Sequence, residues 1–138
     1  MTAASGPEID AGAVGEVTLT VAAAETAARF GLDPGEAYPE VFATAHMVRE
    51  MERAAAKLMR PLLAPGELSV GVRVDVSHLA PTPTGGLVTT RARFTGREGR
   101  LYWFEVRAED AGGVIGEGRH ARAIVDEARL LATAAARR

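Results

Sequence analysis

Three polar side chains of this chain have types and spacing suited to nucleophilic and acid–base chemistry: Thr44, Glu52 and His78. A hydroxyl, a carboxylate and an imidazole supply the nucleophile, the base and the orienting acid that recur on unrelated folds. Histidine titrates near neutral pH, so His78 is the natural proton carrier of such a set. This chemistry requires that the elements bearing the three residues pack against one another.

His78 ends a strand-like run in which every even position from residue 70 to residue 76 is a valine. Because side chains alternate between the two faces of a strand, the pattern predicts that His78 enters the same buried layer as these valines. The structural alternative is a half-exposed residue at the end of a strand, with one ring nitrogen bonded to a backbone carbonyl.

Thr44 and Glu52 lie on one predicted helix, residues 44–60, which is rich in Ala, Met, Leu, Glu and Arg. Eight residues along a helix correspond to a rotation of about 80° and a rise of roughly 12 Å, so the two side chains share a broad face without touching. A third group would have to lie between or beside them. The structural alternatives are a capping role for Thr44 and a solvated carboxylate at Glu52 beside Arg49 and Arg53.

The elements that must position these residues follow an α+β plan. A first strand is expected at residues 15–21 and a short helix at 23–30, ahead of the long helix. Four strand-like runs come after it, separated by turns that carry glycine, and their short spacing favours an antiparallel meander. The pattern predicts a single hotdog domain in which the antiparallel sheet wraps around one long helix. The four runs span residues 68–79, 87–94, 101–108 and 114–125.

The length of 138 residues fits one domain, expected at residues 15–131. Residues 1–14 and 132–138 have no core pattern and are expected to be flexible ends. The first residues lack the pattern of a signal peptide, and no apolar run approaches the length of a membrane span, so a cytoplasmic protein that is not embedded in a membrane is expected.

The composition argues against several classes of partner and site. A hydrophobic fraction of 47%, a charged fraction of 25% and a net charge of -2 give no basic excess for nucleic acid or an anionic membrane surface. The absence of cysteine excludes disulfides, thiolate nucleophiles and zinc–thiolate sites. His46, His78 and His120 are widely spaced, so no metal site is expected.

Several separate blocks of the sequence resemble the fluoroacetyl-CoA thioesterase family of hotdog enzymes, over roughly residues 15–130. The resemblance implies that Thr44, Glu52 and His78 are the catalytic residues and that Gly71 and Arg122 line the acyl pocket. The matching blocks are Tyr38–Thr44, Met47–Val48, Met51–Glu52, Pro65–Glu67, Ser77–His78 with Ala80, Thr82 and Pro83 behind them, and Gly116–Ala123.

The loop before the helix departs from that family. Its fluorine-selective member carries a lid of phenylalanines, whereas this chain has Tyr38 at the nearer lid position and Gly35 at the other. A tyrosine hydroxyl makes the lid more polar and a glycine opens space. A different or larger acyl group is therefore expected as readily as fluoroacetyl, with Tyr38 among the substrate-binding residues.

The sequence and the resemblance together predict an acyl-CoA thioesterase that hydrolyses a small acyl thioester, carried on coenzyme A or on an acyl carrier. No cofactor is expected beyond the coenzyme A of the substrate, and exposed strand edges predict a homodimer. Glu52 could act as a base on water or as a covalent nucleophile, while Thr44 could attack or orient the carbonyl. Free N–H groups at the helix start could hold the oxyanion.

Two other functions compete with hydrolysis. A non-catalytic hotdog protein would hold an acyl thioester or small ligand, with Thr44 and His78 as hydrogen-bond donors. A hotdog dehydratase would act on a hydroxyacyl thioester, but the chain lacks the pattern of an aspartate five residues before a histidine.

Overall fold

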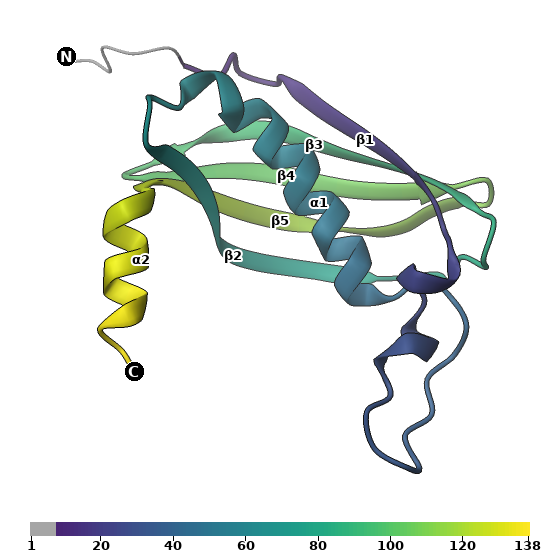
Figure 1. Cartoon of the computed structure of the whole chain (residues 1–138). Coiled ribbons are helices and arrows are strands. Elements are labelled where there is room, and N and C mark those ends of the chain that lie inside the picture. Colours follow the sequence, from purple (N-terminus) through teal and green to yellow (C-terminus); the bar gives the residue numbers. More distant parts are fainter. Residues whose placement is uncertain (1–7) are drawn as a thin grey trace.

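The computed structural model describes residues 8–138, in which a five-stranded antiparallel sheet curls around one long helix, α1 (Figure 1). The expected hotdog plan of a sheet wrapped around a helix is confirmed. The strands are β1 (Val14–Thr20), β2 (Glu67–His78), β3 (Leu87–Glu98), β4 (Leu101–Asp110) and β5 (Gly113–Asp126); the helices are α1 (Thr44–Met59) and α2 (Glu127–Ala135), with short 3₁₀ turns η1 (Ala23–Glu25), η2 (Ala27–Phe30) and η3 (Arg60–Leu62).

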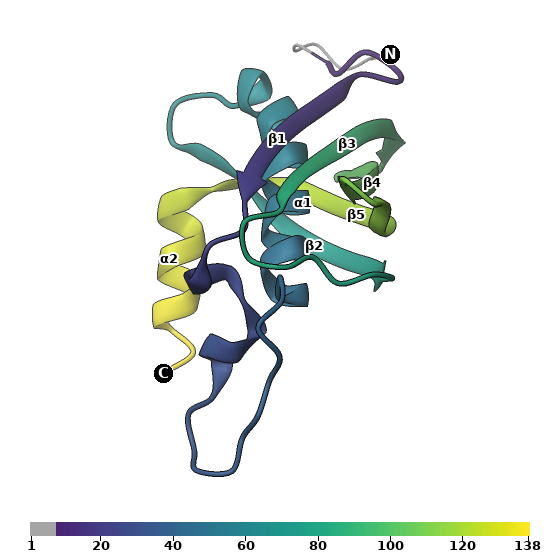
Figure 2. The ribbon, with the colours of Figure 1, turned by 90° about the vertical axis from the view of Figure 1, so that its right-hand side faces the viewer.

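Helix α1 lies across the concave face of the sheet and closes the core, as the two perpendicular views show (Figure 1, Figure 2). Apolar residues recur along α1 at helical spacing, so they form one stripe on the helix, and this stripe is buried against the sheet. Alternate residues of the strands are buried on the sheet's side of the core, among them Phe104 and Val106 of β4. The buried apolar residues of α1 are Met47, Met51, Ala54, Ala55 and Met59.

The strand order β1-β3-β4-β5-β2 differs from the predicted four-strand meander. Strands β3, β4 and β5 do follow one another, but β2 pairs with β5 at the far edge of the sheet. The link between β2 and β3 is too long for a tight hairpin, and its Thr82 is tied to other elements. The Thr82 hydroxyl donates to Asp110 Oδ2 at 2.7 Å, and its carbonyl accepts from the Phe42 N–H at 2.8 Å. Strands β1 and β2 are therefore the two edges.

A β-bulge interrupts β2 and corrects the predicted alternation of its valines. Gly71 is paired with Arg122 of β5, but Arg73 is paired with Ala121, so β2 carries one extra residue at this point. After the bulge, Val74, Val76 and His78 face the core side together. Before the bulge the even positions point the other way: Val70 is paired with Ala123, and both lie on the opposite face of the sheet.

The ends of the described chain differ from expectation in one respect. Residues 127–135 form α2, which no pattern in the sequence predicted. Asp126 caps this helix by accepting from the Arg129 N–H at 2.9 Å, yet none of the helix residues is buried. The first seven residues of the predicted flexible N-terminus lie outside the described residues. Within residues 8–138, no helix is long and apolar enough to cross a membrane.

Candidate active site

The structure brings Thr44 and His78 into direct contact. Thr44 is the first residue of α1, and its Oγ1 lies 2.7 Å from Nδ1 of His78 at the end of β2. The capping position belongs to Ala43, whose methyl side chain cannot cap, so the capping role considered for Thr44 is wrong. His78 is half-buried at the end of β2, as the alternative of a strand-end histidine described, but its Nδ1 contacts a hydroxyl and not a backbone carbonyl.

Backbone hydrogen bonds hold the start of α1 in place beneath this pair. The Ala43 N–H donates to the Glu25 carbonyl at 2.9 Å, and the Met47 N–H donates to the Ala43 carbonyl at 2.9 Å. Phe42, just before them, is buried in the core. The helix thus begins at a rigid point and presents the N–H groups of its first turn, which carry the positive end of the helix dipole, next to Thr44.

The environment of His78 favours a neutral ring. Burial lowers the pKa of His78 below its ordinary value, because desolvation penalises the charged form. If the Thr44 hydroxyl donates to Nδ1, the ring hydrogen sits on Nε2. That atom is buried and makes no hydrogen bond within residues 8–138. A neutral imidazole with a free lone pair toward a hydroxyl can accept its proton.

A second cluster forms around Glu52. Its Oε1 accepts from Nη1 of Arg122 at 3.3 Å. Arg122 is buried on β5, and Ser69 anchors it twice: Nε donates to Ser69 Oγ at 3.0 Å and Nη2 to the Ser69 carbonyl at 2.9 Å. Glu52 is therefore a half-exposed carboxylate held by a fixed guanidinium, and its predicted place beside Arg49 and Arg53 is wrong, because both of these pair with Glu50.

Gly71 belongs to the same cluster, because a side chain at this position would collide with Glu52. A Cβ at this position would lie 2.7 Å from Glu52 Oε1 and 3.2 Å from Cε1 of His120. Only glycine leaves room for the carboxylate to approach the strand so closely. Of the residues predicted from the resemblance, Gly71, Arg122 and Glu52 are thus gathered in one place.

Two residues of this region were not predicted as site residues from the sequence. Glu50 is fully buried and forms ion pairs with the two arginines that were expected beside Glu52. Its carboxylate lies 2.9 Å from Arg49 Nε and 2.7 Å from Arg53 Nη1. Its position three residues after Met47, on the apolar stripe, was the available signal. His120 is buried beside Arg122, and a spacing of two along a strand could have indicated their common face.

The two clusters stand apart within the chain. Thr44 and Glu52 are separated by eight residues on α1, a rise of roughly 12 Å. His78 and Gly71 are correspondingly seven residues apart on β2, and both face α1. The chain therefore contains the predicted site in two separate parts, the Thr44–His78 half-site and the Glu52–Arg122 half-site.

A cavity of about 390 Å³ opens beside the Thr44–His78 half-site. The loop that leads from η2 to α1 projects away from the body of the fold next to it (Figure 1). Tyr38, on this loop, is 45% exposed and donates to Glu36 Oε1 at 3.0 Å, so it does not reach the Thr44–His78 half-site. Apolar residues that line the cavity include Ala27, Pro39, Val41, Leu79, Ala80 and Pro81.

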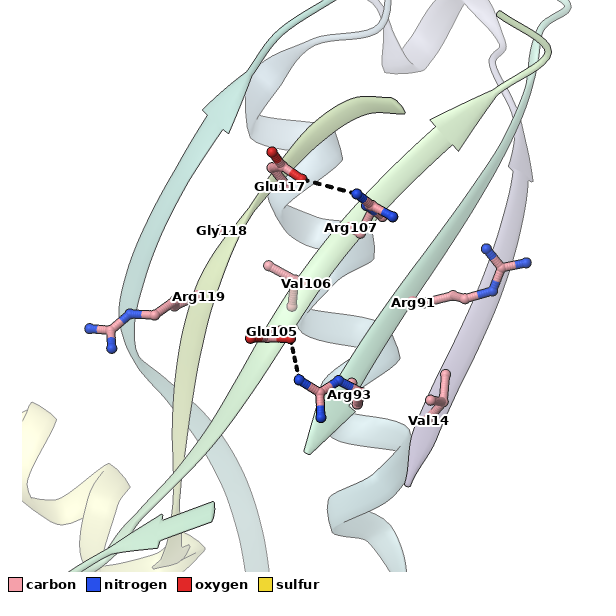
Figure 3. A pocket seen from close by; sticks show the side chains of 9 residues that line it. All are labelled: Val14, Arg91, Arg93, Glu105, Val106, Arg107, Glu117, Gly118 and Arg119. Carbon is pink, nitrogen blue, oxygen red and sulfur yellow. Dashed lines mark hydrogen bonds and ion pairs between the residues drawn. The ribbon is translucent and has the colours of Figure 1, made fainter. Parts of the chain in front are cut away.

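A larger hollow of about 570 Å³ lies on the opposite face of the sheet and contains none of the predicted catalytic residues. Figure 3 shows its charged side chains in front of the strands, with α1 behind them. Arg93 pairs there with Glu105, and Arg107 Nη2 lies 3.5 Å from Glu117 Oε1. This hollow is a solvated face of matched charges. Across residues 8–138, no three His, Cys, Asp or Glu side chains are grouped to hold a metal ion.

Known proteins resemble this chain in sequence. Residues 21–128 match the model of a family described as Fluoroacetyl-CoA-specific thioesterase. A curated relative, the fluoroacetyl-CoA thioesterase of Streptantibioticus cattleyicolor, is 46% identical over 88 residues, which are 64% of this chain and 63% of the relative. The aligned region thus spans a little less than two thirds of that relative.

Solved structures resemble it along nearly the whole chain. A structure of the fluoroacetyl-CoA thioesterase FlK superimposes with a TM-score of 0.90 and 34% identity, covering 96% of this chain and 99% of that one. A Thermus thermophilus hypothetical protein, a thioesterase superfamily member, follows with a TM-score of 0.82, 30% identity and coverage of 91% and 90%. FlK variants have been solved with fluoroacetate and CoA and with acetyl-CoA.

Proposed function

The chain belongs to the family of fluoroacetyl-CoA-specific thioesterases, and we propose that it hydrolyses acyl-CoA thioesters with Thr44, Glu52 and His78 as its catalytic residues. The 2.7 Å contact between the Thr44 hydroxyl and the His78 ring carries this proposal. It joins a potential nucleophile to a neutral base at the start of a helix, beside a cavity with apolar walls.

In the proposed first step, Thr44 Oγ1 attacks the thioester carbonyl carbon while its proton passes to Nδ1 of His78. The negative charge that develops on the carbonyl oxygen is met by N–H groups of the first turn of α1. The C–S bond then breaks, and the proton on His78 passes to the departing thiolate. The products of this step are an acyl ester on Thr44 and free coenzyme A.

The second step hydrolyses that ester. Water gives a proton to a base and attacks the acyl carbon, and when the bond between the acyl carbon and Thr44 Oγ1 breaks, that proton passes from the base through His78 to Thr44 Oγ1. Glu52 is the proposed base for this water, because its carboxylate is held 3.3 Å from the guanidinium of Arg122 and is half exposed, so water can reach it. The carboxylic acid leaves, and the enzyme returns to its starting state.

Because Glu52 lies far from Thr44 in one protomer, we propose that two protomers share each site. Strand β2 is an unpaired edge of the described sheet, and its Val72 and Val74 are 40% and 46% exposed. If two β2 strands pair antiparallel about Asp75, and the bulge leaves Val72 out of this pairing as it does in the pairing with β5, His78 comes opposite Gly71 of the partner subunit. The hydroxyl–imidazole half-site then meets the carboxylate–guanidinium half-site.

Mixing inactive variants tests this arrangement. Protomers with Thr44→Ala and protomers with Glu52→Gln are each expected to be inactive, but an equal mixture should recover about a quarter of wild-type activity, since half the dimers then contain one intact shared site. A site built within one protomer recovers nothing. Size-exclusion chromatography with light scattering should show the dimer, and a monomer contradicts the proposal.

Steady-state hydrolysis of an acyl-CoA panel tests the activity itself. Thr44→Ala and His78→Ala should each lower kcat/KM by about 10²- to 10⁴-fold, whereas Thr18→Ala, an exposed threonine of β1, should change nothing. The competing binding function predicts that the chain binds acyl-CoA without releasing thiol. A panel from fluoroacetyl and acetyl to longer and aromatic acyl groups, each on coenzyme A and on an acyl carrier, identifies the substrate.

The cavity beside Thr44 supports an acyl group larger than fluoroacetyl. Its walls are mostly apolar and it is open to solvent, so the described residues do not confine it to a two-carbon acyl group. Longer acyl groups should therefore show higher kcat/KM than acetyl-CoA. The reverse order contradicts this assignment without affecting the proposed catalytic residues.

A further inference from the structure

His120 is a buried titratable residue to which the mechanism above gives no role. It lies on β5, two residues before Arg122, and is 1% exposed. Its neighbours across the ladder are Val74 of β2 and Phe104 of β4, so its ring projects to the core side of the sheet. A buried histidine needs a partner for each ring nitrogen, and both of its partners are identifiable.

The hydrogen bonds of His120 define its tautomer. Nδ1 lies 2.8 Å from the carbonyl oxygen of Arg73, which can only accept, so Nδ1 carries the ring hydrogen. Nε2 lies 3.2 Å from Nη1 of Arg122, which can only donate, so Nε2 is the bare acceptor. Both contacts are satisfied by one neutral form of the ring.

Arg122 uses its remaining donors in a fixed arrangement. Two of its nitrogens bind Ser69, and Nη1, the nitrogen that meets His120, also donates to Glu52 Oε1 at 3.3 Å. The imidazole and the carboxylate thus share one guanidinium nitrogen. Any movement of that nitrogen changes the position of Glu52, which is otherwise half exposed.

We infer that the neutral His120 ring is a positioning residue, which holds the Arg122 guanidinium against Glu52 and so fixes the carboxylate for the reaction. The inference rests on the proposed role of Glu52. Protonation of Nε2 would replace the acceptor by a donor and set an imidazolium against a guanidinium. Arg122 would then turn away, and Glu52 would lose its partner.

The surroundings keep the ring neutral. Burial lowers the pKa of His120, the Arg122 cation lowers it further, and the Arg73 carbonyl and the Glu52 carboxylate oppose the change. The charged groups that face the ring are Arg122 from β5 and Glu52 from α1. Strand β2 contributes the Arg73 carbonyl, and β4 contributes the uncharged Phe104.

Three variants of the full-length protein test the inference. His120→Phe fills the space but accepts no hydrogen bond, and it should lower kcat about 10- to 100-fold with little change in KM. His120→Gln, whose amide oxygen can accept from Arg122, should restore most of the loss. Phe104→Leu changes the packing beside the ring and should lower the melting temperature without lowering kcat. Equal kcat for His120→Phe and wild type overturns the inference.

A measurement without turnover separates this inference from the proposed function. In ¹⁵N NMR spectra of the imidazole rings at pH 7, His120 should appear as the neutral tautomer with hydrogen on Nδ1. A hydrogen on Nε2, or an imidazolium, overturns the inference even if the protein is an active thioesterase. Absence of hydrolysis with every thioester tested refutes the proposed function. The NMR result then still tests whether neutral His120 accepts a hydrogen bond from Arg122.

Discussion

Replacement of Gly71 by alanine should separate catalysis from stability. The new Cβ would lie 2.7 Å from Glu52 Oε1, so the carboxylate oxygen must retreat by about 0.7 Å to reach an ordinary contact. The Arg122–Glu52 contact is already 3.3 Å long, and such a retreat takes it beyond hydrogen-bonding distance. A displacement of this size in a positioned catalytic group costs up to about 10²-fold in rate.

The stability cost of Gly71→Ala should be small by comparison. The atom that must move is the end of a flexible, half-exposed side chain, so the overpacking cost should be about 1 kcal/mol. The assay is kcat/KM on the best acyl-CoA substrate together with urea unfolding. Gly31→Ala is the matched control, because its Cβ would come no closer than 3.8 Å to any atom. Wild-type kcat/KM in Gly71→Ala refutes the reasoning.

The remaining predictions concern pH, a buried ion pair and the loop before α1. Burial lowers the pKa of both His78 and His120, so the unfolded chain binds more protons than the folded one below about pH 6.5. The free energy of unfolding should therefore fall as the pH drops from 7 to 5 in a urea series, and a constant value contradicts this assignment. Glu50→Ala leaves Arg49 and Arg53 without their buried partner, but both guanidiniums are half exposed and stay hydrated, so it should cost about 1 kcal/mol in the same assay while kcat is unchanged; a loss above about 3 kcal/mol contradicts this reasoning. Tyr38→Phe removes the hydroxyl that donates to Glu36, and it should shift the ratio of kcat/KM values between fluoroacetyl-CoA and longer acyl-CoA substrates; identical profiles exclude the loop from selectivity.

Local spacing predicted the elements well, because it depends on rules that act within a few residues. The helix expected at residues 44–60 is observed at Thr44–Met59, since its apolar stripe and the proline that follows it define both its buried face and its end. The first strand is observed at Val14–Thr20, one residue from the expected range. The place of β2 at the far edge was not predictable in this way, because strand order depends on contacts between distant segments, such as that of Thr82 with Asp110.

The two glutamates of α1 show where residue type stops being informative. Glu50 and Glu52 are two residues apart, which turns them by about 200° around the helix axis. Glu50 enters the core under Arg49 and Arg53, while Glu52 meets Arg122 across the sheet. Charge pattern alone assigned both arginines to the wrong carboxylate. Only the apolar stripe, on which Glu50 lies, distinguishes the structural glutamate from the one beside Gly71.

The valine run that ends at His78 shows why regular alternation was insufficient for the site. Gly71 and His78 are seven residues apart, and in a regular strand an odd separation places two residues on opposite faces. The bulge adds one residue and turns both toward α1. Without it, either the histidine would lose Thr44 or the glycine would lose Glu52. Both half-sites therefore depend on an irregularity that the even spacing of the valines conceals.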